Sequence, residues 1–188
     1  MPDELRIIGV DPGSLRCGYG VVELRGSELC TVEYGVIEAG RRAETLGERL
    51  RLIFTRLQAV VERTAPHEAA IESLFYARNA QSLAKLAHAR GVALLIFALA
   101  QLPVAEYAPR QVKQAVVGQG NATKEQVRYM VQRLLALRET PQMYDATDAL
   151  AVALCHGFRR LKPTDRSAPR TWKEFIERFP ERVVPPQV

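Results

Sequence analysis

Four carboxylates occupy positions in this sequence from which they could share one site. Asp11 and Glu72 each end a short apolar run, in RIIGVD and AAIE, and Asp145 and Asp148 lie three residues apart in YDATDALAVAL. On a helix, a spacing of three places two side chains on one face, with Cβ atoms about 5–6 Å apart. Each also has a simpler interpretation alone: a turn residue, a solvated strand end, an N-cap, and a residue favoured by the helix dipole.

Four carboxylates that converge repel one another unless a cation balances their charge. Oxygen ligands without His or Cys suit a hard ion, Mg²⁺ or Mn²⁺. Two such ions about 3.5–4 Å apart can activate a water and stabilise the leaving oxygen of an in-line phosphoryl displacement. That chemistry requires no nucleophilic side chain, and the sequence contains neither a GxSxG motif nor a Walker A loop. The carboxylates therefore favour metal-dependent phosphoryl chemistry.

Cysteine and histidine offer no competing metal site. Cys17, Cys30 and Cys155 are odd in number and have no CxxC or Cys/His ligand spacing, and the three histidines are scattered. This usage predicts buried thiols in a reducing compartment, neither disulfides nor a zinc site. No signal peptide is visible at the start, MPDELR, so we expect a cytoplasmic protein.

The elements that must position these residues follow from periodicity and turn residues. Strand-like runs over residues 5–11, 18–24 and 29–39 are joined by Gly- and Ser-bearing turns, which predicts an antiparallel meander. The following elements alternate: a helix over 44–63, a strand over 69–72, a helix over 79–101, a strand over 103–107, two helices flanking 118–121 and a last helix over about 146–160.

This order predicts one α/β domain, a three-layer sandwich in which helices cover both faces of a mixed five-stranded sheet. Ligands of such sheets gather outside the carboxyl ends of the strands, where Asp11 and Glu72 lie. The helix over 79–101 becomes apolar all round after Gly91, so we expect its own sheet to cover one side and a partner subunit the other. The run from Gly91 to Ala100 is too short to span a bilayer, which needs about 20 residues.

The charge is distributed unevenly along the chain, which has a net charge of +5. Residues 1–74 hold 9 Lys/Arg and 12 Asp/Glu, whereas residues 75–138 hold 9 Lys/Arg and only Glu106 and Glu125. A basic segment beside an acidic one fits a polyanion-binding face next to a carboxylate site, and it also fits a solvated helix surface. From Lys162 onward Pro, Ser and Arg dominate, which predicts a mobile basic tail over 163–188 in which only 172–179 could form a short helix.

Four segments of the sequence resemble the RuvC family of Holliday-junction resolvases: GVDPGSLRCGYGVV, AIESLFYARNAQSLAKLAHARGVA, YAPRQVKQAVVGQGNATKEQV and DATDALAVALCH. The resemblance covers about residues 5–160 in the family's order and implies a ribonuclease H-like fold. It makes Asp11, Glu72, Asp145 and Asp148 the catalytic carboxylates that bind Mg²⁺, two ions per site, for which Mn²⁺ substitutes. It also implies a homodimer that acts with the RuvA and RuvB branch-migration proteins.

The same resemblance indicates which residues contact DNA. Lys113 and Lys124 match basic residues that approach the DNA backbone, and Phe75 matches an aromatic residue that stacks on bases at the junction centre. Further basic or aromatic residues that follow a catalytic strand or border the Gly-rich loop are candidate DNA contacts or plain surface and core residues: Tyr76, Arg78, Lys85, Arg90, Arg110 and Arg128.

The favoured function is a structure-selective endonuclease that resolves four-way DNA junctions in recombination and repair. We expect two symmetric metal-dependent nicks that leave 5′-phosphate and 3′-hydroxyl ends, made by a nuclease domain over 1–162. Two alternatives stay open. Asp-x-Gly-Ser between two strands also resembles the phosphate loop of an actin-like phosphotransferase or ATPase, although a second such loop is missing; the other alternative is a catalytically silent junction-binding module.

Overall fold

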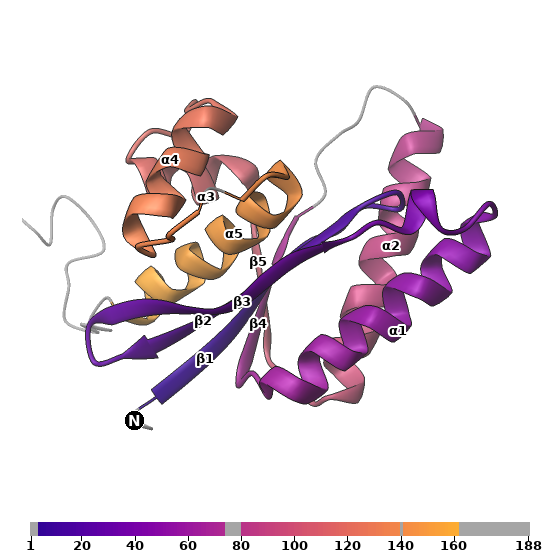
Figure 1. Ribbon diagram of the computed structural model, residues 1–188, viewed down its shortest axis with the longest axis horizontal. Coiled ribbons are helices and arrows are strands. Elements are labelled where there is room, and N and C mark those ends of the chain that lie inside the picture. The colour runs from indigo at the N-terminus through magenta and orange to yellow at the C-terminus, as the bar shows by residue number, and fades with distance from the viewer. Residues whose placement is uncertain (1–3, 74–79, 140, 162–188) are drawn as a thin grey trace, which may run out of the picture.

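The computed structural model describes residues 4–73, 80–139 and 141–161 of the chain. A five-stranded sheet in the order β3-β2-β1-β4-β5 forms its middle layer, with α1 and α2 on one face and α3, α4 and α5 on the other (Figure 1). This confirms the predicted three-layer α/β sandwich. The elements are β1 (Glu4–Asp11), β2 (Cys17–Arg25), β3 (Glu28–Ile37), the 3₁₀ helix η1 (Ala39–Arg41), α1 (Leu46–Thr64), β4 (Glu68–Glu72), α2 (Ala80–Leu99), β5 (Val104–Tyr107), α3 (Pro109–Val117), α4 (Lys124–Leu134) and α5 (Tyr144–Leu161).

The sheet is mixed, as predicted. Strands β1, β2 and β3 form an antiparallel meander, whereas β1 pairs with β4 and β4 with β5 in parallel. The parallel pairs need crossover connections, which α1 and α2 supply on the same face of the sheet. The carboxyl ends of β1 and β4 therefore meet at one edge, where β2 begins.

Alternation along the strands divides the core into two halves. In β1, Ile8 and Val10 pack against α1 and α2, whereas Ile7 packs with α5. In β4, Ala69 and Ile71 face α1 and α2, and Ala70 faces α5. Because successive side chains of a strand point to opposite faces, Asp11 and Glu72 share the parity of Ile7 and Ala70 and lie on the α5 face.

Two helix starts differ from the predicted positions. Helix α1 begins at Leu46 because Thr45 caps it: the Thr45 hydroxyl accepts from the Glu48 N–H at 3.3 Å, and the Glu48 carboxylate accepts from the Thr45 N–H at 3.1 Å. Helix α5 begins at Tyr144, so Asp145 is in its first turn and is not the N-cap.

Helix α2 is buried on one face only. Ala89, Ala93, Ile96 and Phe97 belong to the core with α1 and the sheet, whereas 66% of Leu99 is exposed. By length and composition alone Gln81–Leu99 could cross a membrane, so the apolar segment is longer than the ten residues from Gly91. This criterion is weak evidence for a single helix, because core helices of soluble proteins also meet it.

Candidate active site

Asp11 and Glu72 lie side by side on the sheet. The parallel register pairs Val10 with Ile71, so the next residues, Asp11 and Glu72, are neighbours at the ends of β1 and β4. The two carboxyl groups are close enough for the negative charge of Glu72 to raise the pKa of Asp11. The sheet therefore brings together the first half of the predicted site from residues 61 positions apart in the chain.

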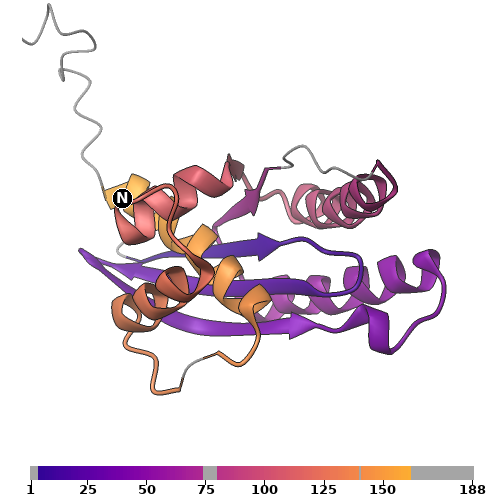
Figure 2. The same cartoon turned by 90° about the horizontal axis from the view of Figure 1, so that it is seen from above.

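The second half of the predicted site, Asp145 and Asp148, lies on α5, which packs closely on the sheet. Gly18 pairs with Asp11 in the antiparallel register, and a Cβ atom at Gly18 would collide with the backbone oxygen of Asp145. Gly9 faces Ala149 and Ala153 of α5 in the same way. Because glycine has no side chain, α5 lies directly across β1 and β2 (Figure 2). The first turn of α5 is therefore beside Asp11.

The four carboxylates are close enough to influence one another's ionisation. Burial raises the pKa of Asp11 well above its ordinary value, and the negative charges of Glu72, Asp148 and Asp145 raise it further. Burial and the charge of Asp148 also raise the pKa of Glu72. Without a cation, burial and the neighbouring negative charges therefore disfavour ionisation of Asp11. A site in which carboxylates hinder one another's ionisation is suited to divalent cations.

Basic side chains neutralise part of this charge. Lys124 Nζ lies 2.9 Å from Asp148 Oδ2, and this hydrogen bond raises the pKa of Lys124. Arg16 Nε lies 3.4 Å from Asp145 Oδ2. The positive charge of Lys113 offsets part of the increase in the pKa of Glu72. Among the described residues no three His, Cys, Asp or Glu side chains are grouped closely enough to hold a metal ion, and Asp148 and Asp145 are paired with Lys124 and Arg16. The donor set itself fits a hard cation, because all of its ligands are carboxylate oxygens.

Two residues near the site were missed by sequence reasoning. Arg16 pairs with Asp145, and its position in the turn directly after Asp11 is the signal that could have found it. The ring of Tyr144 lies beneath the guanidinium of Arg128, at 5.2 Å, and beside Lys124 Nζ, at 6.0 Å. Tyr144 adjoins the predicted Asp145 in the sequence, so two basic side chains lie against the residue next to the site.

The predicted DNA-contacting residues fall into different environments. Lys85 and Arg110 are exposed, and Lys113 and Lys124 are close enough to the carboxylates to influence their pKa values. Arg90 is largely buried and forms an ion pair with Glu106, an arrangement typical of a structural residue. Three further predicted contacts lie outside the described residues: Phe75, Tyr76 and Arg78.

The cysteines are free, as predicted, and Cys17 adjoins the site without joining it. Its side chain belongs to the core on the α1 and α2 face, opposite to Asp11. Burial, and then the charge of Asp11, raise the pKa of Cys17 to about 12, so the thiol is not ionised at neutral pH.

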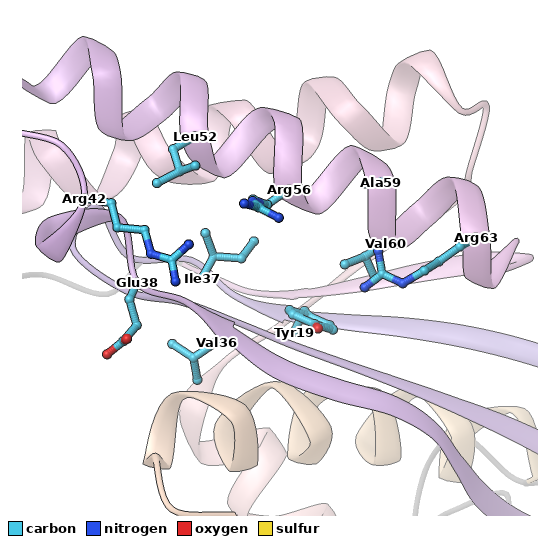
Figure 3. A pocket seen from close by; sticks show the side chains of 10 residues that line it. All are labelled: Tyr19, Val36, Ile37, Glu38, Arg42, Leu52, Arg56, Ala59, Val60 and Arg63. Atoms are coloured by element: carbon cyan, nitrogen blue, oxygen red, sulfur yellow. The ribbon is translucent and has the colours of Figure 1, made fainter.

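A hollow of about 240 Å³ lies between α1 and strands β2 and β3, on the other face of the sheet (Figure 3). Arg42, Arg56 and Arg63 surround it, and Tyr19 lies at its floor. Arg63 is paired with Glu33, which also accepts a hydrogen bond of 2.9 Å from the Tyr19 hydroxyl. None of the predicted site residues line this hollow, so it is separate from the carboxylate site.

The chain matches a known family over most of its length. The family described as crossover junction endodeoxyribonuclease RuvC matches residues 7–156. The chain belongs to the RuvC family of metal-dependent endonucleases. The RuvC of Hahella chejuensis is 53% identical over 152 residues, which cover 81% of this chain and 87% of that protein. The RuvC of Porphyromonas gingivalis is 41% identical over 188 residues and covers 97% of this chain and 98% of its own length.

A solved structure supports the fold of this RuvC family member. This chain resembles the structure of Thermus thermophilus RuvC in complex with a Holliday junction substrate. The TM-score is 0.79 and the sequence identity 35%, and the match covers 85% of this chain and 97% of that one. The predicted ribonuclease H-like fold is confirmed by this match. The alignment with the P. gingivalis protein covers 97% of the chain and therefore includes most of residues 163–188.

Proposed function

We propose that this chain resolves four-way DNA junctions in recombination and repair by two symmetric nicks. The proposal is supported by the register that sets Asp11 beside Glu72 at one sheet edge and by the close approach of Asp145 on α5 to Gly18, the partner of Asp11. The raised pKa values of Asp11 and Glu72 agree with this position. Membership of the RuvC family supports a four-way junction as the substrate, because the structure of one member has been solved with a Holliday junction. Each cut breaks a P–O3′ bond and leaves 5′-phosphate and 3′-hydroxyl ends.

The four carboxylates are proposed to hold two Mg²⁺ ions, for which Mn²⁺ substitutes. When bound, these ions supply Lewis-acid stabilisation of the attacking and leaving oxygens. The protein's own contribution is to fix the carboxylates on β1, β4 and α5 before the substrate arrives. The raised pKa of Asp11 supports this assignment, because a carboxylate whose ionisation is disfavoured by partial burial and like charges gains most from a balancing cation.

Lys124 and Lys113 are proposed to bind the DNA phosphates at the site. Lys124 is 2.9 Å from Asp148 and at the first position of α4, where free backbone N–H groups also favour a phosphate. Transfer of the ammonium group from Asp148 to a phosphate would free that carboxylate for metal binding. Arg16 is placed to do the same for Asp145. DNA and metal would then bind cooperatively.

Residues 1–162 are proposed to form the nuclease domain and 163–188 a basic extension. We further propose a cytoplasmic homodimer that works with RuvA and RuvB. A C₂ dimer presents two identical sites, which match the two equivalent strands of a junction. The exposed side chains of Leu95 and Leu99 on α2 support an interface on this helix. Phe75, outside the described residues, is proposed to stack on an unpaired base near the cut.

Cleavage of a synthetic four-way junction in Mg²⁺ tests the proposal. Two nicks at symmetry-related positions, with ends that ligase seals, are expected, and linear duplex of the same sequence should stay intact. Omission of the metal should stop cleavage while binding persists. Binding without nicks in either Mg²⁺ or Mn²⁺ would instead identify a junction-binding module, and ATP turnover without nicks would identify a phosphotransferase.

A further inference from the structure

A groove of about 900 Å³ lies at the end of the molecule opposite to the carboxylates. It runs between the start of β3, the segment that follows α4, and the C-terminal part of α5. Its lining is mainly apolar and includes Leu29, Tyr34, Leu134, Leu137, Leu154 and Phe158. The carboxylates are at the first turn of α5 and Phe158 is in its last turn, so the groove is separate from the candidate active site.

The groove is open on a surface that would otherwise expose apolar side chains. Leu154 forms part of its floor and is fully buried, whereas Leu134 at its rim is 39% exposed. β3 is an edge strand of the sheet, and its first residues form one wall. Exposed edge strands invite pairing with other chains, and proteins commonly cover them. These features call for an apolar segment that lies across the groove.

The chain itself continues from this place. Helix α5 ends at Leu161, less than one turn after Phe158, and its C-terminal end lies beside the β2–β3 hairpin (Figure 1). Gly157 faces Leu29 of that hairpin, which places the exit of the chain at the groove wall. Pro163 and Pro169 prevent the next residues from extending the helix. Residues 162–171 can span at most roughly 33–36 Å, enough to reach any part of the groove.

The remaining residues carry a pattern that fits such a groove. In WKEFIERF, residues 172–179, the apolar side chains Trp172, Phe175, Ile176 and Phe179 follow the spacing i, i+3, i+4, i+7. All positions between them are charged. An amphipathic helix with this spacing is the usual occupant of an apolar groove. The alignment with the P. gingivalis protein includes most of this region, so the extension is shared with a relative.

We infer that residues 172–179 form a short amphipathic helix that docks in the groove between β3, α4 and α5 of the same chain. A tethered segment needs only modest intrinsic affinity, because a short linker holds it at an effective concentration of about millimolar. Docking covers the edge of β3 and the end of α5. It replaces the expectation that the whole extension is mobile, and it is independent of the proposed nuclease activity.

Trp172 is the only tryptophan of the chain, so its fluorescence reports on this segment directly. In the full-length protein we expect blue-shifted emission and weak quenching by acrylamide. Leu134→Glu should shift the emission to longer wavelength and increase quenching severalfold. Val104→Glu is the matched control, because Val104 is 38% exposed on the opposite edge strand and should leave both signals unchanged. Solvent-exposed Trp172 in the wild type, or emission that Leu134→Glu does not alter, would overturn the inference.

A cysteine pair identifies the occupant independently of any destabilisation by Leu134→Glu. Cys30 lines the groove, whereas Cys17 and Cys155 are buried. After air oxidation, Phe175→Cys should form a disulfide with Cys30 within one chain, and Glu174→Cys, on the charged face of the segment, should not. A covalent dimer on a non-reducing gel would show that the segment of a second copy fills the groove. Equal crosslinking by both variants would show that the segment is not docked; either result would refute docking within one chain.

Discussion

Asp11 is the residue on which the electrostatics of the site depend most. It is half-buried at the end of β1, and the other three carboxylates all act to raise its pKa. Lys124 opposes this increase, but its ammonium group is hydrogen-bonded to Asp148, and Arg16 is paired with Asp145. A cation bound beside Asp11 would favour its ionised form.

Asp11→Asn should abolish junction cleavage and leave junction binding nearly intact. The side chain keeps its size, but the site loses the carboxylate that neighbours Glu72. We expect a rate loss on the order of 10²–10³-fold or more, the range seen when one preorganised electrostatic group is removed. Affinity comes mainly from Lys and Arg contacts with phosphates and should persist. Nicking assays in Mg²⁺ beside gel-shift assays in EDTA separate the two effects, and near wild-type cleavage would refute the site assignment.

The stability of metal-free protein should reveal the same carboxylate without an activity assay. Because the pKa of Asp11 is higher in the folded than in the unfolded chain, the folded state binds more protons between the two values, and stability falls as pH rises through that window. At neutral pH in EDTA, Asp11→Asn should therefore melt at a higher temperature than the wild type. The difference should shrink toward about pH 4, near the ordinary pKa of Asp. Mg²⁺ should raise the melting temperature of the wild type more than that of the variant.

Lys124→Gln should weaken both phosphate binding and cleavage. Removal of one phosphate contact reduces the slope of log affinity against log salt by about 1. Cleavage should fall further than affinity, because Lys124 is also within hydrogen-bond distance of Asp148. Arg133→Gln, an exposed site at the other end of α4, is the control. Titrations at several salt concentrations would contradict the assignment if both variants had the wild-type slope.

At the scale of secondary-structure elements, the contact between α5 and the β1–β2 pair decides whether the site exists. Asp145 and Asp148 share a face of α5 by their spacing alone, but that face reaches Asp11 only because Gly18 and Gly9 allow close approach. Sequence reasoning treated Gly18 as the start of a strand. The absence of a side chain at Gly18 is as important for the site as the carboxylates themselves, because it lets Asp145 approach Asp11.

Gly18→Ala should displace the first turn of α5 and impair catalysis. The added methyl group would overlap the backbone of Asp145, and overpacking of this kind costs about 1–3 kcal/mol. We expect a lower melting temperature and a larger loss of cleavage than of binding. Gly47→Ala in α1 is the matched control: its Cβ would meet open space, so it should stabilise the helix by roughly 0.5–1 kcal/mol. Equal behaviour of the two variants would contradict the role assigned to Gly18.

At the scale of the whole molecule, the two faces of α2 differ in a way that suggests assembly. One face is part of the core with α1, whereas Leu95 and Leu99 on the other are 52% and 66% exposed. A second copy of the chain that covers this face with its own α2 would bring two carboxylate sites into a symmetric pair. A four-way junction has the same twofold symmetry.

The double variant Leu95→Glu/Leu99→Glu should be monomeric. The two charges would be buried without partners in a dimer, whereas both are solvated in the monomer. Sedimentation at micromolar concentration should give a dimer for the wild type and a monomer for the variant. The variant should bind junctions poorly and cut at most one strand. A monodisperse wild-type monomer would contradict the proposed homodimer.

The sequence by itself determined the features that depend on local periodicity. Strand parity and the order of elements placed Asp11 and Glu72 at one sheet edge, and a helical spacing of three placed Asp145 and Asp148 on one face. The capping box of Thr123 and Gln126, residues three apart in the sequence, is of the same local kind, and both of its hydrogen bonds are present. Each of these follows from residues a few positions apart, for which backbone geometry fixes the relation.

Only the tertiary structure decided the contacts between distant elements. It paired Lys124 with Asp148 and Arg16 with Asp145, buried Arg90 beside Glu106, and left one face of α2 exposed. These relations depend on how closely α5 approaches the sheet and on how each helix is rotated about its axis. Local periodicity does not encode either quantity, because both result from the packing of side chains that are far apart in the sequence.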